Sequence, residues 1–286
     1  MSVDSLNRLA KAFGRLRHNK KAFVGLLMLI SVVFVAVFAP LLTPYTPDDM
    51  RAGPLFERPC RTHLFGTDRF GRDGFCRTIF GARISLGISL QVCVLAFLVG
   101  VPPGLLAGFR GGLLDNFLMR LADLLFTLPS VLMALFIAAI IGPGTATVRI
   151  ALTIVYMPQF LRLSRASAMG TANREFVTAA RSVGVKEFRI ITRHILPNCA
   201  APLMIQTALV MSYAILAEAA LSYLGVGVPP PTPSWGVMLR EGVEQMYSAP
   251  YLAIFPGLAV TFLVLSLNLL GDGLRDLLDP YFRGRE

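Results

Sequence analysis

The sequence has few charged residues for its length. Of its 286 residues only 15% are Asp, Glu, Lys or Arg, whereas 55% are hydrophobic and the mean hydropathy is +0.63. Soluble globular domains contain about a quarter charged residues, so this composition excludes an ordinary soluble domain. Intrinsic disorder is also excluded, because the chain has far more apolar surface than a solvated chain carries. The composition indicates an integral membrane protein.

Several motifs of catalytic and metal-binding proteins are missing from the sequence. The four cysteines stand at positions 60, 76, 93 and 199 without a CxxC pair, and they predict neither a disulfide scaffold nor a zinc motif. The sequence contains no GxxxxGK[ST] phosphate loop, no HExxH and no GxSxG. We therefore predict no catalytic residue, metal site or cofactor on this chain. Uphill transport would take its energy from a partner or an ion gradient.

Six stretches of the sequence are apolar and long enough to cross a membrane. A hydrocarbon core of about 30 Å requires roughly 20 helical residues. The stretches cover residues 22–42, 84–108, 118–142, 148–168, 201–225 and 252–274. We therefore predict an all-α polytopic membrane protein with six transmembrane helices.

The distribution of basic residues predicts how these helices are oriented. With the N-terminal segment 1–21 in the cytoplasm, 18 of the 27 Lys and Arg lie on the cytoplasmic side. The positive-inside rule therefore favours two cytoplasmic termini, including the tail 275–286. Residues 43–83 and 226–251 are then extracytoplasmic, and residues 169–200 form a cytoplasmic loop. Because topology and contact with membrane lipid explain the net charge of +10, nucleic-acid binding is not predicted.

The cytoplasmic loop contains two short amphipathic segments. Asn173 is expected to be the N-cap of the first, Gly184 to end it in a left-handed conformation, and Pro197 to end the second. Apolar residues at helical spacing form two stripes: Phe176, Ala179, Ala180 and Val183, then Phe188, Ile191 and Ile195. Such a pair docks either against a protein partner or on lipid headgroups, and the pattern alone favours neither.

The same loop resembles the EAA loop of ABC importer permeases. Thr178-Ala-Ala-Arg-Ser-Val-Gly184 is followed, after nine residues, by His194-Ile-Leu-Pro197, the spacing of E-A-A-x3-G-x9-I-x-L-P. The residues that match are Ala179, Ala180, Gly184, Leu196 and Pro197. Thr178 replaces the glutamate of the pattern and His194 replaces its isoleucine. The helix–glycine–helix geometry is therefore expected, but a glutamate-specific contact is not.

Five further segments resemble the peptide/nickel class of these permeases, specifically the C-type subunit of dipeptide and oligopeptide importers. They are His63–Asp73, Gly81–Leu86, Glu218–Gly225, Pro231–Gly236 and Asn268–Asp276. The resemblance extends over nearly the whole chain. It implies the type I ABC importer fold, also called MetI-like, with residues 84–274 as the permease core.

The resemblance also implies an assembly in the bacterial inner membrane. A homologous second permease would form the other half of the pathway, and two partner ATPase subunits would bind ATP and Mg²⁺. An extracytoplasmic binding protein would deliver a peptide or a similar small solute. The loop would transmit the motion of the ATPases to the membrane helices. The expected coupling residues are Glu175, Phe176, Thr178, Ala179, Ala180, Arg181, Gly184, Leu196 and Pro197.

Three acidic residues lie in or near the predicted membrane helices. Because ionisable groups are costly in lipid, Asp123, Glu218 and Asp272 are expected to face the pathway or to form interhelical contacts. Gly100, Gly104 and Gly108 recur at every fourth residue, which is typical of close helix packing.

Two features of the predicted outer loops have competing interpretations. Trp235, the single tryptophan, either shapes the external face met by the binding protein or anchors the chain among the lipid headgroups. Cys60 and Cys76 fall in the same loop, and a disulfide between them is a hypothesis that this compartment permits.

Two other classes of function compete with the importer interpretation. A gradient-driven secondary transporter or channel is expected to show inverted repeats, and no convincing internal repeat is found. A structural membrane subunit needs no ATPase partner, so co-purification of ATPase subunits would separate these classes. The sequence does not specify the solute, and a dipeptide, an oligopeptide, glutathione and a nickel complex all stay open.

Overall fold

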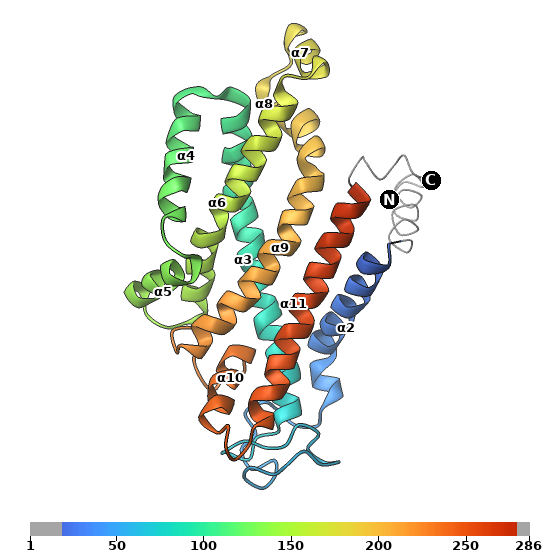
Figure 1. Ribbon diagram of the computed structural model, residues 1–286, viewed down its shortest axis with the longest axis vertical. Coiled ribbons are helices and arrows are strands. Elements are labelled where there is room, and N and C mark those ends of the chain that lie inside the picture. The colour runs from blue at the N-terminus through green and yellow to red at the C-terminus, as the bar shows by residue number, and fades with distance from the viewer. Residues whose placement is uncertain (1–18, 279–286) are drawn as a thin grey trace.

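Most of the chain between residues 19 and 278 is helical. The computed structural model describes these residues, which form a long bundle (Figure 1). Most of the predicted segment 1–21 and part of the predicted tail 275–286 lie outside the described residues. The elements are α2 (Lys20–Leu42), α3 (Gly74–Arg110), α4 (Gly112–Phe126), α5 (Ser130–Ile141), α6 (Thr145–Ala172), α7 (Glu175–Ser182), α8 (Glu187–Ile190), the π turn η1 (Ile191–Ile195), α9 (Leu196–Tyr223), α10 (Trp235–Glu244) and α11 (Tyr251–Leu278).

The bundle has two distinct ends. One end, here named the α7 end, carries α7 and α8, and the start of α2 and the last turns of α11 point toward it (Figure 1). The opposite end, named the α10 end, carries α10 and the loop 43–73 between α2 and α3 (Figure 1). Asn19 Nδ2 donates a hydrogen bond to the carbonyl oxygen of Gly273 (3.4 Å), so the start of α2 is held against α11.

Four helices within residues 19–278 are long and apolar enough to cross a membrane. They are α2, α3, α11 and the continuous helix from Glu187 to Tyr223, which includes α8, η1 and α9. The pair α4 and α5 adds a fifth if it counts as one span. α6 has 28 residues but contains Arg149, Arg162 and Arg165, and it does not pass the same test.

The apolar stretch predicted as one membrane helix over residues 118–142 forms two helices. α4 ends at Phe126, α5 begins at Ser130, and the axes of the two helices differ by 89°. Pro129 causes this break, because its ring keeps the preceding Leu128 from continuing the helix. A proline within an apolar stretch here produces a corner instead of a kink.

α3 begins ten residues before the expected start at residue 84. Asp73 is its N-cap, and the Asp73 carboxylate accepts a hydrogen bond from the backbone N–H of Cys76 (2.7 Å). Arg77 lies in the predicted extracytoplasmic loop 43–83, but its guanidinium is buried and donates to Glu241 of α10 (3.0 Å). An ion pair therefore allows a charged residue inside the first turn of a long apolar helix.

The loop 43–73 forms a folded cap over the α10 end. Asp68 accepts from Arg72 (2.6 Å), and Asp73 lies 2.8 Å from the Nδ1 atom of His63. The disulfide hypothesis is wrong, because all four cysteines are free. Cys76 is buried and donates to the carbonyl of Tyr45 (3.2 Å), whereas Cys60 lies in the loop and accepts from the N–H of His63 (3.3 Å).

α3 and α6 pack along a seam of glycines. A Cβ atom added at Gly100 or Gly104 would lie less than 3.0 Å from the backbone of α6, and so would one added at Gly108. The α6 carbonyls that face these glycines belong to Met157, Leu161 and Arg165, which are also four residues apart. The predicted role of the repeat in close helix packing is confirmed.

Candidate functional site

Helix α7 at the α7 end begins one residue later than expected. Arg174 is the N-cap of α7 and has an extended backbone (φ −76°, ψ 148°), which an N-cap requires. Asn173 ends α6 with φ −94° and ψ 5°, so the prediction of Asn173 as the N-cap is wrong. The Arg174 side chain makes no capping hydrogen bond, and α7 keeps Glu175 in its first turn, where a negative charge is favourable.

Gly184 turns the chain at the end of α7, as predicted. Its φ is +76°, and its backbone N–H donates to the carbonyl of Arg181 (2.9 Å). The N–H of Val185 donates to the carbonyl of Ala180 (3.1 Å), which completes a Schellman motif. No other atom lies within 4 Å of a Cβ built on Gly184. The position therefore requires glycine for its backbone conformation and not for space.

The predicted apolar stripe of α7 is not the side of the helix that is buried. Val177 and Ala180 are buried against the core of this chain, together with Ile190 and Ile195. Phe176 is 40% exposed, Val183 80% and Phe188 77%. Thr178 and Ala179 are exposed as well. We name Phe176, Val183 and Phe188 the apolar corner, because they are the exposed large hydrophobic side chains of α7, α8 and the turn between them.

Two basic residues tie this corner to the bundle. Arg110, at the end of α3, forms an ion pair with Glu187 of α8 (2.6 Å). The guanidinium of Arg181 lies 4.3 Å from the ring centroid of Phe109, a cation–π contact with the same end of α3. α7 and α8 are thus attached to α3 at two points.

Pro197 does not end the second segment, contrary to the prediction. Residues Ile191–Ile195 form a π turn, and the N–H of Leu196 donates to the carbonyl of Ile191. This wider turn comes directly before Pro197, which has no N–H to donate. The helix therefore continues from Glu187 to Tyr223 without a corner. Leu196 and Pro197 belong to the first turn of α9.

Glu218 is fully buried in α9 near the α10 end. Its two carboxylate oxygens accept hydrogen bonds from the hydroxyls of Ser85 in α3 and Ser222 in α9, each at 2.9 Å. Of the two predicted environments, the bond from Ser85 matches the interhelical contact. The bond from Ser222 lies within α9, and its spacing of one helical turn is visible in the sequence, whereas Ser85 comes close only through folding.

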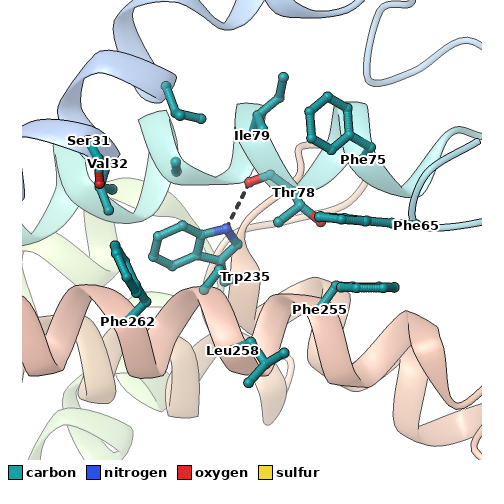
Figure 2. Close-up of a pocket in the computed structure, with 13 residues that line it drawn as sticks. Ser31, Val32, Phe65, Phe75, Thr78, Ile79, Trp235, Phe255, Leu258 and Phe262 are labelled. Carbon is teal, nitrogen blue, oxygen red and sulfur yellow. Dashed lines mark hydrogen bonds between the residues drawn. The ribbon is translucent and has the colours of Figure 1, made fainter. Parts of the chain in front are cut away.

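Trp235 is inside the protein, and both predicted roles on an exposed surface are therefore wrong. The indole is 2% exposed, and its Nε1–H donates to the carbonyl of Thr78 (2.9 Å), as Figure 2 shows. It lines an apolar pocket of about 370 Å³ between α2, α3 and α11, with Val32, Ile79 and Phe262. The two hydroxyls in the lining, Ser31 and Thr78, donate to carbonyls of their own helices. Nothing in the lining would recognise the charged ends of a peptide.

The other two embedded acids lie on exposed positions. Asp123 of α4 pairs with Arg162 of α6, and Asp115 of α4 pairs with Arg165 of α6 (2.6 Å). These two pairs fix α4 on α6 and explain why Arg162 and Arg165 occur in that helix. Asp272 is exposed in α11. Within residues 19–278, no three His, Cys, Asp or Glu side chains are grouped so that they could hold a metal ion.

Comparisons with known proteins bear on the whole chain. Residues 100–284 match the family described as binding-protein-dependent transport system inner membrane component, and residues 7–58 match the N-terminal TM domain of oligopeptide transport permease C. The dipeptide transport system permease protein DppC of Escherichia coli (strain K12) is 45% identical over 92% of this chain and 90% of its own length. The oligopeptide transport system permease protein OppC of Bacillus subtilis (strain 168) is 38% identical over 99% of this chain and 93% of its own.

A solved structure shares the fold at low sequence identity. A chain of the MetNI methionine ABC transporter in an inward-facing conformation matches with a TM-score of 0.56 and 16% identity, over 71% of this chain and 97% of that one. The likeness shows a MetI-like arrangement of helices. Together with the family matches, it confirms the resemblance found in the sequence: the chain belongs to the inner-membrane components of binding-protein-dependent transport systems and is a permease subunit of an ABC importer.

Proposed function

We propose that this chain forms half of the translocation pathway for peptides in a bacterial inner membrane. The names of its relatives support peptides as the solute, since they describe dipeptide, di/tripeptide and oligopeptide transport permeases. A homologous second permease forms the other half, and an extracytoplasmic binding protein delivers the peptide. Two ATPase subunits bind ATP and Mg²⁺, so this chain is not an enzyme by itself.

The apolar corner carries this proposal, because it is an exposed surface on a segment that is otherwise anchored. Val177 and Ala180 hold α7 in the core, while Phe176, Val183 and Phe188 project outward at the tip of the bundle. An ATPase groove that covers these three side chains would pull on α8 and α9 when it moves. Ala180 and Gly184 then act indirectly, Ala180 by docking α7 and Gly184 by setting the turn.

The proposed topology has six spans: α2, α3, the bent pair α4–α5, α6, α8–α9 and α11. At 1.5 Å per residue, the 28 residues of α6 extend about 42 Å, which exceeds a hydrocarbon core of about 30 Å. The α7 end is cytoplasmic and the α10 end extracytoplasmic. The basic residues 174, 181, 186, 189 and 193 near α7 and α8 support this orientation.

A cysteine at the α10 end tests the orientation. Tyr247 follows α10 and its side chain is fully exposed, whereas Ser234 nearby is buried. We expect Tyr247→Cys, in a Cys60→Ser background, to react with a membrane-impermeant thiol reagent in intact spheroplasts. Val183→Cys in the same background, expressed without the ATPases that would cover it, is expected to react only after permeabilisation. The reverse pattern would contradict the proposed orientation.

Transport itself is tested in proteoliposomes. The chain, its co-expressed second permease, the ATPases and the binding protein are expected to take up radiolabelled alanyl-alanine only with ATP. Uptake driven by an ion gradient without ATP would favour a secondary transporter. If no ATPase co-purifies with the chain, it would be a structural subunit instead.

Gly184 provides a test of the turn. A valine there must hold a φ of +76°, which costs about 1 kcal/mol or more, whereas asparagine tolerates the left-handed region. A Cβ built at this position has no other atom within 4 Å, and valine and asparagine are similar in size, so the comparison tests mainly the backbone conformation. We expect Gly184→Val to lower ATP-dependent uptake several-fold and Gly184→Asn to lower it less. Equal uptake by the two variants would show that the turn does not matter for coupling.

A further inference from the structure

A buried hydrogen-bond network joins α9 and α3 to the segment that precedes α10. The hydroxyls of Ser222 and Ser85 donate to the two oxygens of Glu218. Each serine oxygen also accepts a backbone N–H, from Val228 to Ser222 (3.1 Å) and from Trp235 to Ser85 (3.4 Å). Through these two serines, the Glu218 carboxylate is linked to both ends of the segment 226–235. Glu218, Ser85, Ser222, Val228 and Trp235 are named the Glu218 network.

The backbone around this network is in direct contact with α9. A Cβ added at Gly227 would lie less than 3.0 Å from the backbone of Ser222, and one at Gly236 would lie 2.5 Å from the carbonyl oxygen of Ala219. The segment cannot shift along α9 without breaking the hydrogen bonds to the serines. α10 itself is linked to the loop cap and to α3, because Glu241 accepts from Arg72 of the cap (3.3 Å) and from Arg77 of α3 (3.0 Å).

Stability alone does not account for a carboxylate at this position. Burying an ionised group is costly, and no Lys, Arg or His pairs with Glu218 among the described residues, so its hydrogen bonds come from hydroxyls. Apolar side chains could fill the same volume without that cost. What the carboxylate adds is a directional connection between three elements, since its two oxygens are held by two different helices.

α9 also leads directly to the apolar corner. The helix Glu187–Tyr223 has 37 residues and extends about 55 Å, with α7 attached at one end and the Glu218 network near the other. We propose that Glu218 is a positioning residue that transmits displacement of α8 and α9 to the segment 226–235 and to α10. This inference rests on the proposed function, because the ATPases would cause the displacement. The external segment would therefore change position during the ATPase cycle, at the end where the binding protein docks.

Buried serines on the same two helices provide matched variants for a test. Ser85→Ala and Ser222→Ala each remove one hydroxyl that reaches Glu218. Ser89→Ala in α3 and Ser212→Ala in α9 remove equally buried hydroxyls that donate to carbonyls of their own helices, those of Leu86 and Ala208. The full complex is reconstituted in proteoliposomes for each variant. Basal ATPase activity, stimulation by the binding protein and uptake of radiolabelled alanyl-alanine are measured.

We expect Ser85→Ala and Ser222→Ala to lower the stimulated rate by about tenfold, the effect of leaving a buried carboxyl oxygen without its hydrogen bond, while basal activity changes little. The control variants are expected to stay within about twofold of the unmodified complex, since their hydrogen bonds are neutral and local. Glu218→Gln should also lose stimulation, because its amide cannot accept from both serines. A merely structural role would instead lower the basal and stimulated rates together.

Three results overturn the inference, and one of them also concerns the proposed function. If Ser85→Ala and Ser222→Ala keep full stimulation, or lose it no more than Ser89→Ala and Ser212→Ala, the Glu218 network does not transmit motion. If basal and stimulated rates fall in parallel, the network only stabilises the fold. In both cases the unmodified complex still takes up peptide with ATP, and the proposed function stands. Absence of ATP-dependent uptake by the unmodified complex would overturn both proposals.

Discussion

Replacing Phe188 by aspartate is expected to release the ATPase subunits from the purified permease. Phe188 is 77% exposed at the apolar corner, so the substitution leaves the core of this chain intact. Within a protein groove the carboxylate would lose its water without gaining a partner, at a cost of several kcal/mol. Affinity-purified complexes would be compared for the amount of ATPase per permease. We expect a loss of at least about tenfold, because 1.4 kcal/mol already corresponds to that factor.

Two further variants separate the groove from the lipid surface. Phe188→Lys should also release the ATPases if a groove covers the corner, but an added lysine is tolerated among lipid headgroups. Tyr247→Asp places the same new charge on an exposed position at the opposite end and should keep the ATPases. Normal retention of ATPase by both Phe188 variants would contradict the proposed docking surface. The corner would then face lipid or solvent.

Ala180 is a poorer probe of ATPase docking than Phe188, although it belongs to the motif. Ala180 packs against the core of this chain, so a lysine there would detach α7 whatever covers the apolar corner. Helical periodicity in the sequence placed Ala180 on one apolar side of α7, but the helix has a second, partly apolar side. Which side faces inward depends on the contacts of Val177 with the bundle, and these are tertiary.

Local physical chemistry predicted other features well. Apolar stretches located α2, α3, α9 and α11, because a membrane helix needs a long run of apolar residues and little else. The turn at Gly184 was predictable, because helices commonly end at a glycine that takes the left-handed conformation. The repeat of Gly100, Gly104 and Gly108 predicted a close helix contact, although not that the partner is α6.

Prolines and buried polar groups were less predictable. Pro129 produces a corner and Pro197 follows a π turn, although both stand beside apolar sequence. The outcome depends on whether neighbouring helices support the interrupted backbone. Trp235 looked exposed because prolines surround it, yet the hydrogen bond to Thr78 satisfies its indole inside the bundle. Such partners are distant in sequence, so no local pattern shows them.

The glycine seam between α3 and α6 leads to the second large effect. Gly104 faces Ser164 and the carbonyl of Leu161, and a Cβ added there would lie less than 3.0 Å from both residues. Ser164 is itself buried, so it has no free space to move into. The carbonyl belongs to the helix backbone of α6 and can yield only if the whole helix moves. Gly87, on the same helix, has no atom within 4 Å of an added Cβ.

We therefore expect Gly104→Ala to destabilise the protein strongly and Gly87→Ala to leave it unchanged or slightly more stable. Overpacking at Gly104 costs about 1–3 kcal/mol, whereas alanine in an open helix position gains about 0.5–1 kcal/mol over glycine. The measurement is the thermal unfolding midpoint of the detergent-solubilised chain, together with its yield in the membrane. Gly104→Ala should lower both, and Gly104→Leu should prevent accumulation of folded protein. Equal midpoints for Gly104→Ala and Gly87→Ala would mean that α3 and α6 do not meet at these glycines, and the helix arrangement that supports both the apolar corner and the Glu218 network would be wrong.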